Sequence, residues 1–322
     1  KRWYRGKEGD SSCSTGFLSS ITCSQSRFTE LLPSRLRHTA GTDEPAFSAA
    51  VRELEVCTNY TQIQPPYSSM QKEWDTTLVR VQEEKVLSAA LDQASKVRLI
   101  AAAAPHSGAF LHARPCSALG TRLENSQLRI AVALRLGAKV CEPHICICGT
   151  HVDNTGRHGL SCRKSAGRLS RHSTVNDLIK RALSLAEIPS RLEPPSLVRE
   201  DGKRPDGMTL TPWSHGRCLV WDFTCPDTFA PSHLNTAVSS PGAVTCEAED
   251  RKRQKYAGLA ASYCFIPIAV ETMGALGEEA VDFIRDLGRR LAIVTGKKRA
   301  TEFLFQRPSV AIQRGNSAAV QG

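Results

Sequence analysis

Apolar side chains recur at the spacing of a helix in three long stretches of the chain. Between residues 69 and 104, valine, leucine and alanine return every three or four positions with charged residues between them, which predicts one long helix or two short ones. Residues 122–137 and 171–186 repeat the pattern, and Gly137 and Pro189 are suitable points for these two helices to end. The chain before residue 140 is therefore expected to be mainly helical.

Short β-rich runs lie in the second half of the chain. The predicted strands are 205–210, 217–224 and 263–270, and the helices predicted between and after them are 246–262, 277–293 and 299–313. The order is helix, strands, helix, strand, helix. This order predicts an α/β fold in which a mixed sheet is flanked by helices.

The first 45 residues are rich in Ser, Thr, Arg and Gly and show no sustained period, so we expect residues 1–45 to be disordered. Hydrophobic residues make up 41% of the 322 positions, which is enough for one large domain or two modest ones. The chain opens with Lys1 rather than Met, and we expect it to be a fragment of a longer protein.

The formal net charge of +10 favours a polyanionic partner, although a soluble protein with an ordinary basic surface would show the same charge. The 12 cysteines come without an apolar leader segment, which indicates a reducing compartment with thiols that are free or bound to metal. No apolar run is long enough to cross a membrane. Residues 296–298 lack the remainder of a phosphate-binding loop, so no small-molecule cofactor is expected.

Cysteine and histidine are concentrated between residues 141 and 170, in the string CEPHICICGTHVDNTGRHGLSC. Zinc takes thiolate and imidazole ligands tetrahedrally and can fold a segment too small to have a core. The best four-ligand set for Zn²⁺ is Cys146, Cys148, His158 and Cys162. A single residue separates the first two, which is tighter than usual, so another donor could replace one ligand. The candidates are Cys141, His144 and His151. A flexible loop of free thiols is the alternative.

Basic residues follow this segment and recur around two later aspartates. Cations beside a metal-stapled loop suit contacts to a phosphate backbone, although a solvated helix face has the same composition. The residues expected to contact nucleic acid are Arg163, Lys164, Arg168, Arg171, Arg204 and Arg251.

Asp206 ends the string Lys-Arg-Pro-Asp, and Asp222 ends the string Leu-Val-Trp-Asp. If the two lie on neighbouring strands, their carboxylates meet at one edge of the sheet and offer oxygen ligands for Mg²⁺, which can activate water against a phosphodiester. Lys255 could supply a cation for the scissile phosphate, and Asp177 or Glu249 could supply a further acid. An aspartate in a turn and a solvated charged helix are the alternatives.

Taken in order, the Cys/His set, the Gly-Arg-x-x-Arg-His string at 167–172, Arg-Pro-Asp at 204–206, Asp222 and Lys255 resemble the C-terminal region of non-LTR retrotransposon polyproteins. Those polyproteins carry a CCHC zinc knuckle and a restriction-like endonuclease, and the resemblance covers residues 122–313. It implies a PD-(D/E)XK fold in which Asp206 and Asp222 are the two acids. The common form has a lysine two positions after the second acid, where this chain has Thr224. In retrotransposon versions the lysine is displaced to a later helix, and Lys255 fits that place.

The resemblance also implies a function. Such proteins nick target DNA in the nucleus and pass its 3′ end to a reverse transcriptase that copies element RNA, so DNA and element RNA are the expected partners. No Tyr/Phe-x-Asp-Asp polymerase string is present. We therefore expect a DNA endonuclease without a polymerase. The expected parts are a helical linker or thumb remnant at 46–140, a zinc knuckle at 141–170 and an endonuclease domain at 171–315. The alternatives are a catalytically dead nucleic-acid-binding remnant, another nuclease of the same fold such as a junction resolvase, and an inactive genomic remnant.

Overall fold

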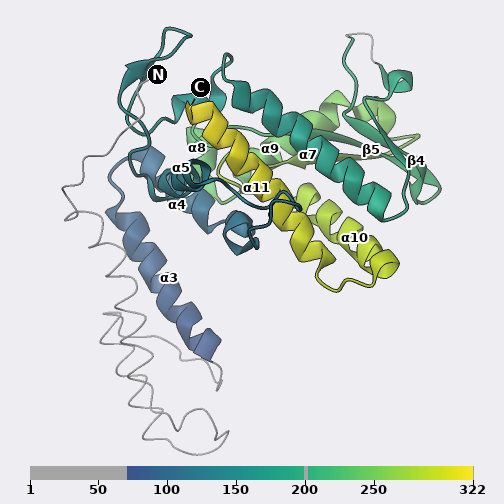
Figure 1. Ribbon diagram of the computed structural model, residues 1–322, viewed down its shortest axis with the longest axis horizontal. Coiled ribbons are helices and arrows are strands. Elements are labelled where there is room, and N and C mark those ends of the chain that lie inside the picture. The colour runs from purple at the N-terminus through teal and green to yellow at the C-terminus, as the bar shows by residue number, and fades with distance from the viewer. Residues whose placement is uncertain (1–70, 199–201, 322) are drawn as a thin grey trace, which may run out of the picture. The chain divides into compact units, whose positions relative to one another are not determined.

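The computed structural model describes residues 71–198 and 202–321, and the expectation of disorder for 1–45 lies outside them (Figure 1). The chain divides into two compact units between Leu91 and Asp92. In the N-terminal unit the described element is helix α3 (Gln71–Ala89). The helical pattern predicted over 69–104 thus forms two helices, and Asp92 caps the second by accepting a hydrogen bond from the backbone N–H of Ser95 at 2.8 Å.

The C-terminal unit contains all the other described elements. Its helices are α4 (Gln93–Ala103), α5 (Asn125–Leu136), α6 (His158–Ser161), α7 (Ala166–Leu185), α8 (Leu234–Ser239), α9 (Ala243–Lys255), α10 (Glu278–Thr295) and α11 (Ala300–Gln321). Short 3-10 turns are η2 (Ala109–His112), η3 (Pro195–Leu197) and η4 (Ala257–Leu259). Its strands are β1 (His144–Ile145), β2 (His151–Val152), β3 (Ser190–Leu192), β4 (Gly207–Ser214), β5 (Arg217–Thr224) and β6 (Cys264–Ala269).

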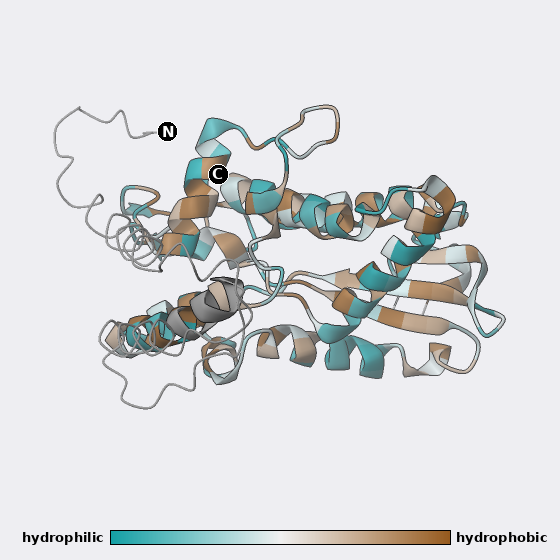
Figure 2. Ribbon diagram, turned by 90° about the horizontal axis from the view of Figure 1, so that it is seen from below, coloured by the Kyte–Doolittle hydropathy of each residue, from teal (hydrophilic) through white to brown (hydrophobic). Residues whose placement is uncertain are grey.

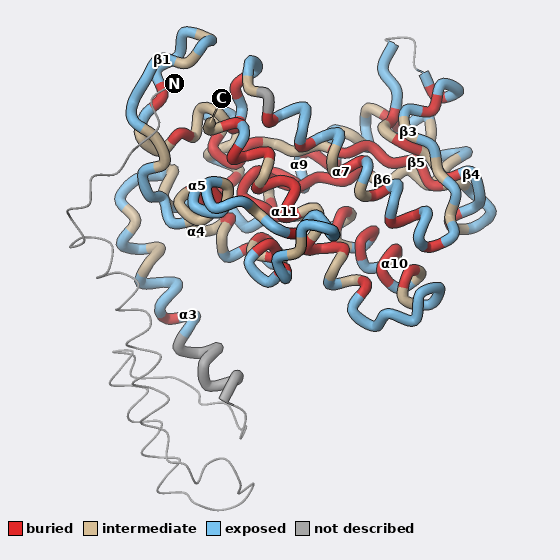
Figure 3. The backbone as a smooth tube through the Cα atoms, in the orientation of Figure 1, coloured by how far each residue is buried: buried red, intermediate tan, exposed pale blue. Residues whose placement is uncertain are grey.

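The main sheet has the strand order β3-β4-β5-β6, in which β3, β4 and β5 are antiparallel and β6 is parallel to β5. Helices cover both faces of this sheet (Figure 2). The expected mixed sheet with flanking helices is therefore confirmed. Strand β5 has the predicted bounds, and its central residues are buried (Figure 3) because both of its faces are covered.

Trp221 anchors the middle of β5. Its side chain is fully buried, and its indole N–H donates to Asn176 Oδ1 on α7 at 3.0 Å. The ring lies where a side chain at Gly207 on the paired strand would be, so only glycine fits there. The hydrogen bond between Trp221 and Asn176 fixes the position of α7 relative to β5 and to the start of β4, where the two aspartates lie.

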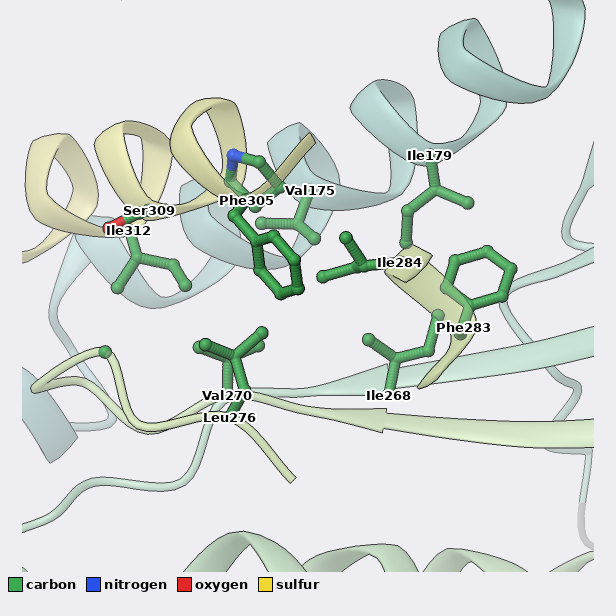
Figure 4. A pocket seen from close by; sticks show the side chains of 12 residues that line it. Val175, Ile179, Ile268, Val270, Leu276, Phe283, Ile284, Phe305, Ser309 and Ile312 are labelled. Carbon is green, nitrogen blue, oxygen red and sulfur yellow. The ribbon is translucent and has the colours of Figure 1, made fainter. Parts of the chain in front are cut away.

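The main core lies between the sheet and helices α7, α10 and α11. A cavity of about 30 Å³ remains within it, lined mainly by apolar side chains that converge from these helices and from β6 (Figure 4). A bound water needs two or more polar partners, and this lining offers almost none. The cavity is therefore a packing defect rather than a ligand site.

Helices α7 and α11 lie side by side, with their backbones in direct contact (Figure 1). A side chain at Gly167 would overlap the carbonyl of Gly315, and a side chain at Gly159 in α6 would overlap the carbonyl of Ala319. These contacts join the Cys/His segment and α7 to the C-terminal helix.

The boundaries of the parts differ from those expected from the sequence. Residues 92–140 belong to the same compact unit as the sheet, and η2 and α5 pack against α11. Helix α7 begins at Ala166, within the segment assigned to the knuckle, and α11 continues past residue 315 to Gln321. None of the helices in the described ranges is both long and apolar enough to span a membrane.

Buried polar groups fill the space between α7, α11 and the loops that follow β5 and β6. Glu271 is 2% exposed and accepts a hydrogen bond from the Thr228 hydroxyl at 2.9 Å. Burial raises the pKa of Glu271 to about 7 because the charged form loses hydration. Near neutral pH both the protonated and the ionised form of the Glu271 carboxyl are therefore populated.

The first prediction concerns the helix contact. We expect Gly167→Ala to lower the free energy of unfolding by about 1–3 kcal/mol, because its methyl group overlaps the Gly315 carbonyl. The free energy of unfolding would be measured by urea denaturation. The matched control is Gly258→Ala in η4, where a new methyl group meets no atom within 4 Å. Equal stability of the two variants would contradict the direct backbone contact.

The second prediction concerns pH. Because the pKa of Glu271 is higher in the folded state than in the unfolded state, its contribution to stability is complete below pH 4.5 and is lost as the pH rises to about 7. Glu271→Gln stays neutral, so the variant should lose less stability than the parent between pH 5 and pH 8. Thermal unfolding at the two pH values measures this difference. Substitution of the exposed Glu278 should leave the parent's pH dependence unchanged.

Candidate functional site

Two groups of chemically active side chains occur in the C-terminal unit. The Cys/His cluster lies in the segment formed by β1, β2 and α6. The acid cluster lies where β4 begins and β5 ends, between α7 and α9. The two groups are joined through α7, which follows directly after the Cys/His segment.

The Cys/His cluster is built from a tight turn and one turn of helix. Cys146 and Cys148 lie in the connection between β1 and β2, where the N–H of Gly149 donates to the Cys146 carbonyl at 2.8 Å. Gly149 has a φ of 89°, a left-handed conformation that glycine adopts without strain. His158 and Cys162 are four residues apart at α6 and so face the same side.

The four predicted ligands converge. Their donor atoms all lie within 4.8 Å of one another, with 3.8 Å between the Sγ atoms of Cys146 and Cys162 and 3.1 Å between Cys148 Sγ and His158 Nε2. Tetrahedral zinc with Zn–S bonds of about 2.3 Å requires sulfur atoms roughly 3.8 Å apart. The cluster could therefore hold a metal ion, and its spacing and donor types fit zinc.

The thiol of Cys148 has a lowered pKa, which favours metal binding. Hydrogen bonds from the hydroxyl and backbone of Thr150 lower its pKa to about 6, so the thiolate, which is the form that binds metal, predominates at neutral pH. The three alternative donors lie outside the convergent group. The thiol of Cys141 donates to the Asp153 carbonyl at 3.3 Å, His144 Nδ1 donates to the Glu142 carbonyl at 2.8 Å, and His151 is exposed on β2.

The acid cluster begins with two aspartates on paired strands. Asp206 precedes β4, and the pairing of Gly207 with Trp221 puts it opposite Asp222 in β5. The N–H of Asp206 donates to the Trp221 carbonyl at 3.0 Å, and the N–H of Phe223 donates to Asp206 Oδ2 at 2.6 Å. The sheet therefore holds both carboxyl groups at one place.

A histidine and a lysine complete the acid cluster. His172 on α7 lies with its Nε2 atom 3.1 Å from Asp206 Oδ2, and Lys252 on α9 forms an ion pair with Asp222 Oδ2. The hydrogen bond to Asp206, together with the negative charges of Asp206 and Asp222, raises the pKa of His172. The side chain of Asp222 is 4% exposed and that of His172 is 47% exposed, so the cluster opens to solvent on the histidine side.

The lysine that pairs with Asp222 differs from the one expected. Lys255 Nζ donates to the Tyr256 hydroxyl at 2.8 Å, and this hydroxyl donates to the carbonyl of Arg204 at 3.0 Å. Lys252 lies one helical turn before Lys255. Its position could have been found from the helical period, because Thr245, Ala248 and Glu249 form the buried face of α9 and Lys252 continues it.

The two additional acids considered from the sequence lie elsewhere. Asp177 is exposed on α7. Glu249 is buried and accepts hydrogen bonds from the N–H groups of Glu279 and Ala280, so it caps the start of α10. Burial raises the pKa of Glu249 to about 7. Its role is structural.

Five of the six basic residues predicted to contact nucleic acid are exposed: Arg163, Lys164, Arg168, Arg204 and Arg251. The prediction was wrong for Arg171, which is 1% exposed. Its guanidinium donates to the Leu160 carbonyl at 2.7 Å and to Asn316 Oδ1 at 3.0 Å. A side chain enclosed in this way cannot reach a phosphate.

No protein-family model matches the chain, and no curated protein is significantly similar to it. The fold and the two clusters define an α/β protein with a Cys₃His group that could bind a metal. What the chain does must therefore be argued from its own geometry.

The third prediction concerns the metal. Purified protein should contain one zinc ion per chain, and Cys162→Ser should lose it and unfold at a lower temperature, because three donors no longer close the tetrahedron. Metal analysis and thermal unfolding give the two readouts. Cys141→Ser is the matched control, since its thiol lies nearby but outside the convergent group. Retention of zinc by Cys162→Ser together with its loss from Cys141→Ser would overturn the ligand assignment.

Proposed function

We propose that the chain is a metal-dependent DNA endonuclease of the restriction-like PD-(D/E)XK type, preceded by a zinc knuckle, as in non-LTR retrotransposon polyproteins. The observation that carries this proposal is the acid cluster, in which Asp206 and Asp222 lie opposite each other on paired strands beside Lys252 and His172. The mixed sheet with helices on both faces is consistent with that fold.

The donors in the acid cluster suit a hard divalent ion. In each aspartate the Oδ2 atom has a partner, whereas Oδ1 has no hydrogen bond or ion pair within the described ranges. Two carboxylate oxygens at one edge are ligands that Mg²⁺ accepts while it keeps several waters. A bound Mg²⁺ would supply Lewis acidity toward a phosphodiester and a water of lowered pKa.

The side chains around the carboxylates have separate roles in this proposal. The ammonium group of Lys252 lies against Asp222 and offsets negative charge that grows on the phosphate during cleavage. The imidazole of His172, on the solvent side, faces an approaching substrate and holds the carboxylate of Asp206 in place. Both side chains come from helices that the core fixes in position.

In this proposal the exposed basic residues after the Cys/His cluster bind the DNA backbone next to Asp206 and Asp222. Arg168 and His172 are four residues apart on α7, so they share a face and lie about 6 Å apart along the helix axis. A phosphate held by Arg168 is therefore close to His172 and Asp206. The knuckle orders the chain that enters α7, and the proposed substrate is duplex target DNA in the nucleus. Element RNA is the second polynucleotide that the resemblance implies.

One observation favours a second candidate, a catalytically inactive nucleic-acid-binding protein. Thr224 occupies the place where the common motif has its lysine, and the carboxylates of Asp206 and Asp222 already have side-chain partners in His172 and Lys252. Ion pairs of this kind also occur as purely structural features. Cleavage activity separates the two candidates.

The fourth prediction tests catalysis. A plasmid-nicking assay with Mg²⁺ should show activity that is lost in Asp206→Asn and Asp222→Asn. It should fall on the order of 100-fold in Lys252→Met, because a charge that stabilises the transition state is removed. Lys255→Met should lose much less activity, since its amine bonds to the Tyr256 hydroxyl.

The exposed Asp282→Asn variant on α10 is the control and should retain the parent's rate. No nicking by a folded, zinc-loaded parent would reject the endonuclease and leave the binding protein. A larger loss in Lys255→Met than in Lys252→Met would restore Lys255 as the catalytic amine. Strong preference for branched over duplex DNA would instead indicate a junction resolvase.

A further inference from the structure

An open groove lies between α7 and α11, on residues that the acid cluster does not use. Its volume is about 540 Å³. The lining residues are Asp177, Lys180, Arg181, Ser184, Leu185 and Arg307. Three cations and a single acid therefore surround one hollow.

The three cations have no ionic partner in the described part of the chain. Neither Lys180 nor Arg181 forms a hydrogen bond or ion pair there, and the guanidinium of Arg307 has only a contact with the ring of Phe303, at 5.5 Å from its centroid. On α10, by contrast, Arg285 is paired with Asp282 and Arg289 with Asp286. The groove is thus a local excess of positive charge.

The two guanidiniums also act on each other. Arg307 is half-buried, and its loss of hydration together with the nearby charge of Arg181 lowers its pKa. Like charges held close together in a partly buried place destabilise the fold unless an anion lies between them. A bidentate guanidinium matches the two oxygens of a phosphate, and Leu185 adds an apolar wall suited to the sugar beside it.

We propose that this groove binds the phosphodiester backbone of duplex DNA, at a place separate from the acid cluster. The choice of DNA as the ligand rests on the proposed function. Lys180 lies eight residues after His172, which is about 12 Å along the axis of α7 and corresponds to fewer than four base pairs of duplex rise. Lys180 is rotated by roughly 80° and Arg181 by roughly 180° around the helix from His172. The groove therefore opens on a different side of α7 from the acid cluster and is a second, separate contact for the DNA backbone.

The test is DNA binding by the full chain as a function of salt. A fluorescent duplex of arbitrary sequence is titrated with zinc-loaded protein in the absence of Mg²⁺, so that no cleavage occurs. We expect Arg181→Gln/Arg307→Gln to weaken binding about ten-fold or more at low salt and to reduce the slope of log affinity against log salt by about two, one for each lost phosphate contact.

Two further variants make the result specific. Arg285→Gln/Arg289→Gln on α10 removes the same charge from paired arginines and should leave the slope unchanged. Arg181→Lys/Arg307→Lys keeps both charges and should keep the slope, which also guards against misfolding of the glutamine variant. An unchanged slope in Arg181→Gln/Arg307→Gln, or an equal fall in the α10 variant, would overturn the proposal. The proposal would also be overturned if Arg181→Gln/Arg307→Gln lost binding to a single-stranded RNA of the same length but kept its binding to duplex DNA.

The outcome does not depend on the nuclease assay. A chain that never nicks DNA can still show the groove's contribution to binding, and an active nuclease can lack it. Failure of the groove and failure of the proposed catalytic function are therefore observed in different experiments.

Discussion

A guanidinium enclosed in the C-terminal unit joins the parts of this protein. Arg171 on α7 donates to the carbonyl of Leu160 in α6 and to the side chain of Asn316 in α11. A buried cation is tolerated only where hydrogen bonds and opposite charge replace its hydration. Burial raises the pKa of Asp227, and the nearby positive charge of Arg171 offsets part of that rise. Loss of any one partner would leave a charged group exposed to a low-dielectric interior. The contact therefore fixes α6, α7 and α11 relative to one another.

This constraint reaches both clusters. Leu160 lies between His158 and Cys162, so the carbonyl that Arg171 holds belongs to the helical turn that presents two of the four metal donors. On the other side, the residue after Arg171 is His172, which contacts Asp206. Two adjacent residues of α7, Arg171 and His172, thus contact the Cys/His segment and the acid cluster respectively. Metal bound by the first would stabilise the helix that shapes the second, without any direct contact between the two.

The local sequence pattern predicted most of the long helices and strands β5 and β6, but it missed β3 and α8 and part of the two clusters. Strand β5 could be predicted with its observed bounds, because a β-rich run between polar residues leaves few alternatives. The four convergent donors were the preferred set among seven candidates, and the folding of the turn at Cys148 separates them from the other three. The predicted nucleic-acid contact of Arg171 is wrong, and the helical period already indicates its burial, because Arg171 lies four residues before Val175 on the apolar face of α7. The helical period of α9 places Lys252 on the buried face, but its pairing with Asp222 and that of His172 with Asp206 required tertiary structure, since the partners are distant in sequence.

In the proposed endonuclease, Lys252 supplies the amine of the acid cluster, although Thr224 occupies the place of the lysine in the common form of the motif that the sequence resembles. Strands β5 and β6 are parallel, so the chain must cross over between them, and α9 is part of that crossover. Its buried residues, among them Glu249, fix which face meets the sheet, and Lys252 is the next residue on that face and pairs with Asp222. In the common form of the motif the lysine would lie on the same strand as the second acid, whereas Lys252 reaches the carboxylate of Asp222 from helix α9. The proposed chemistry requires a cation beside the phosphate and does not specify the element that carries it.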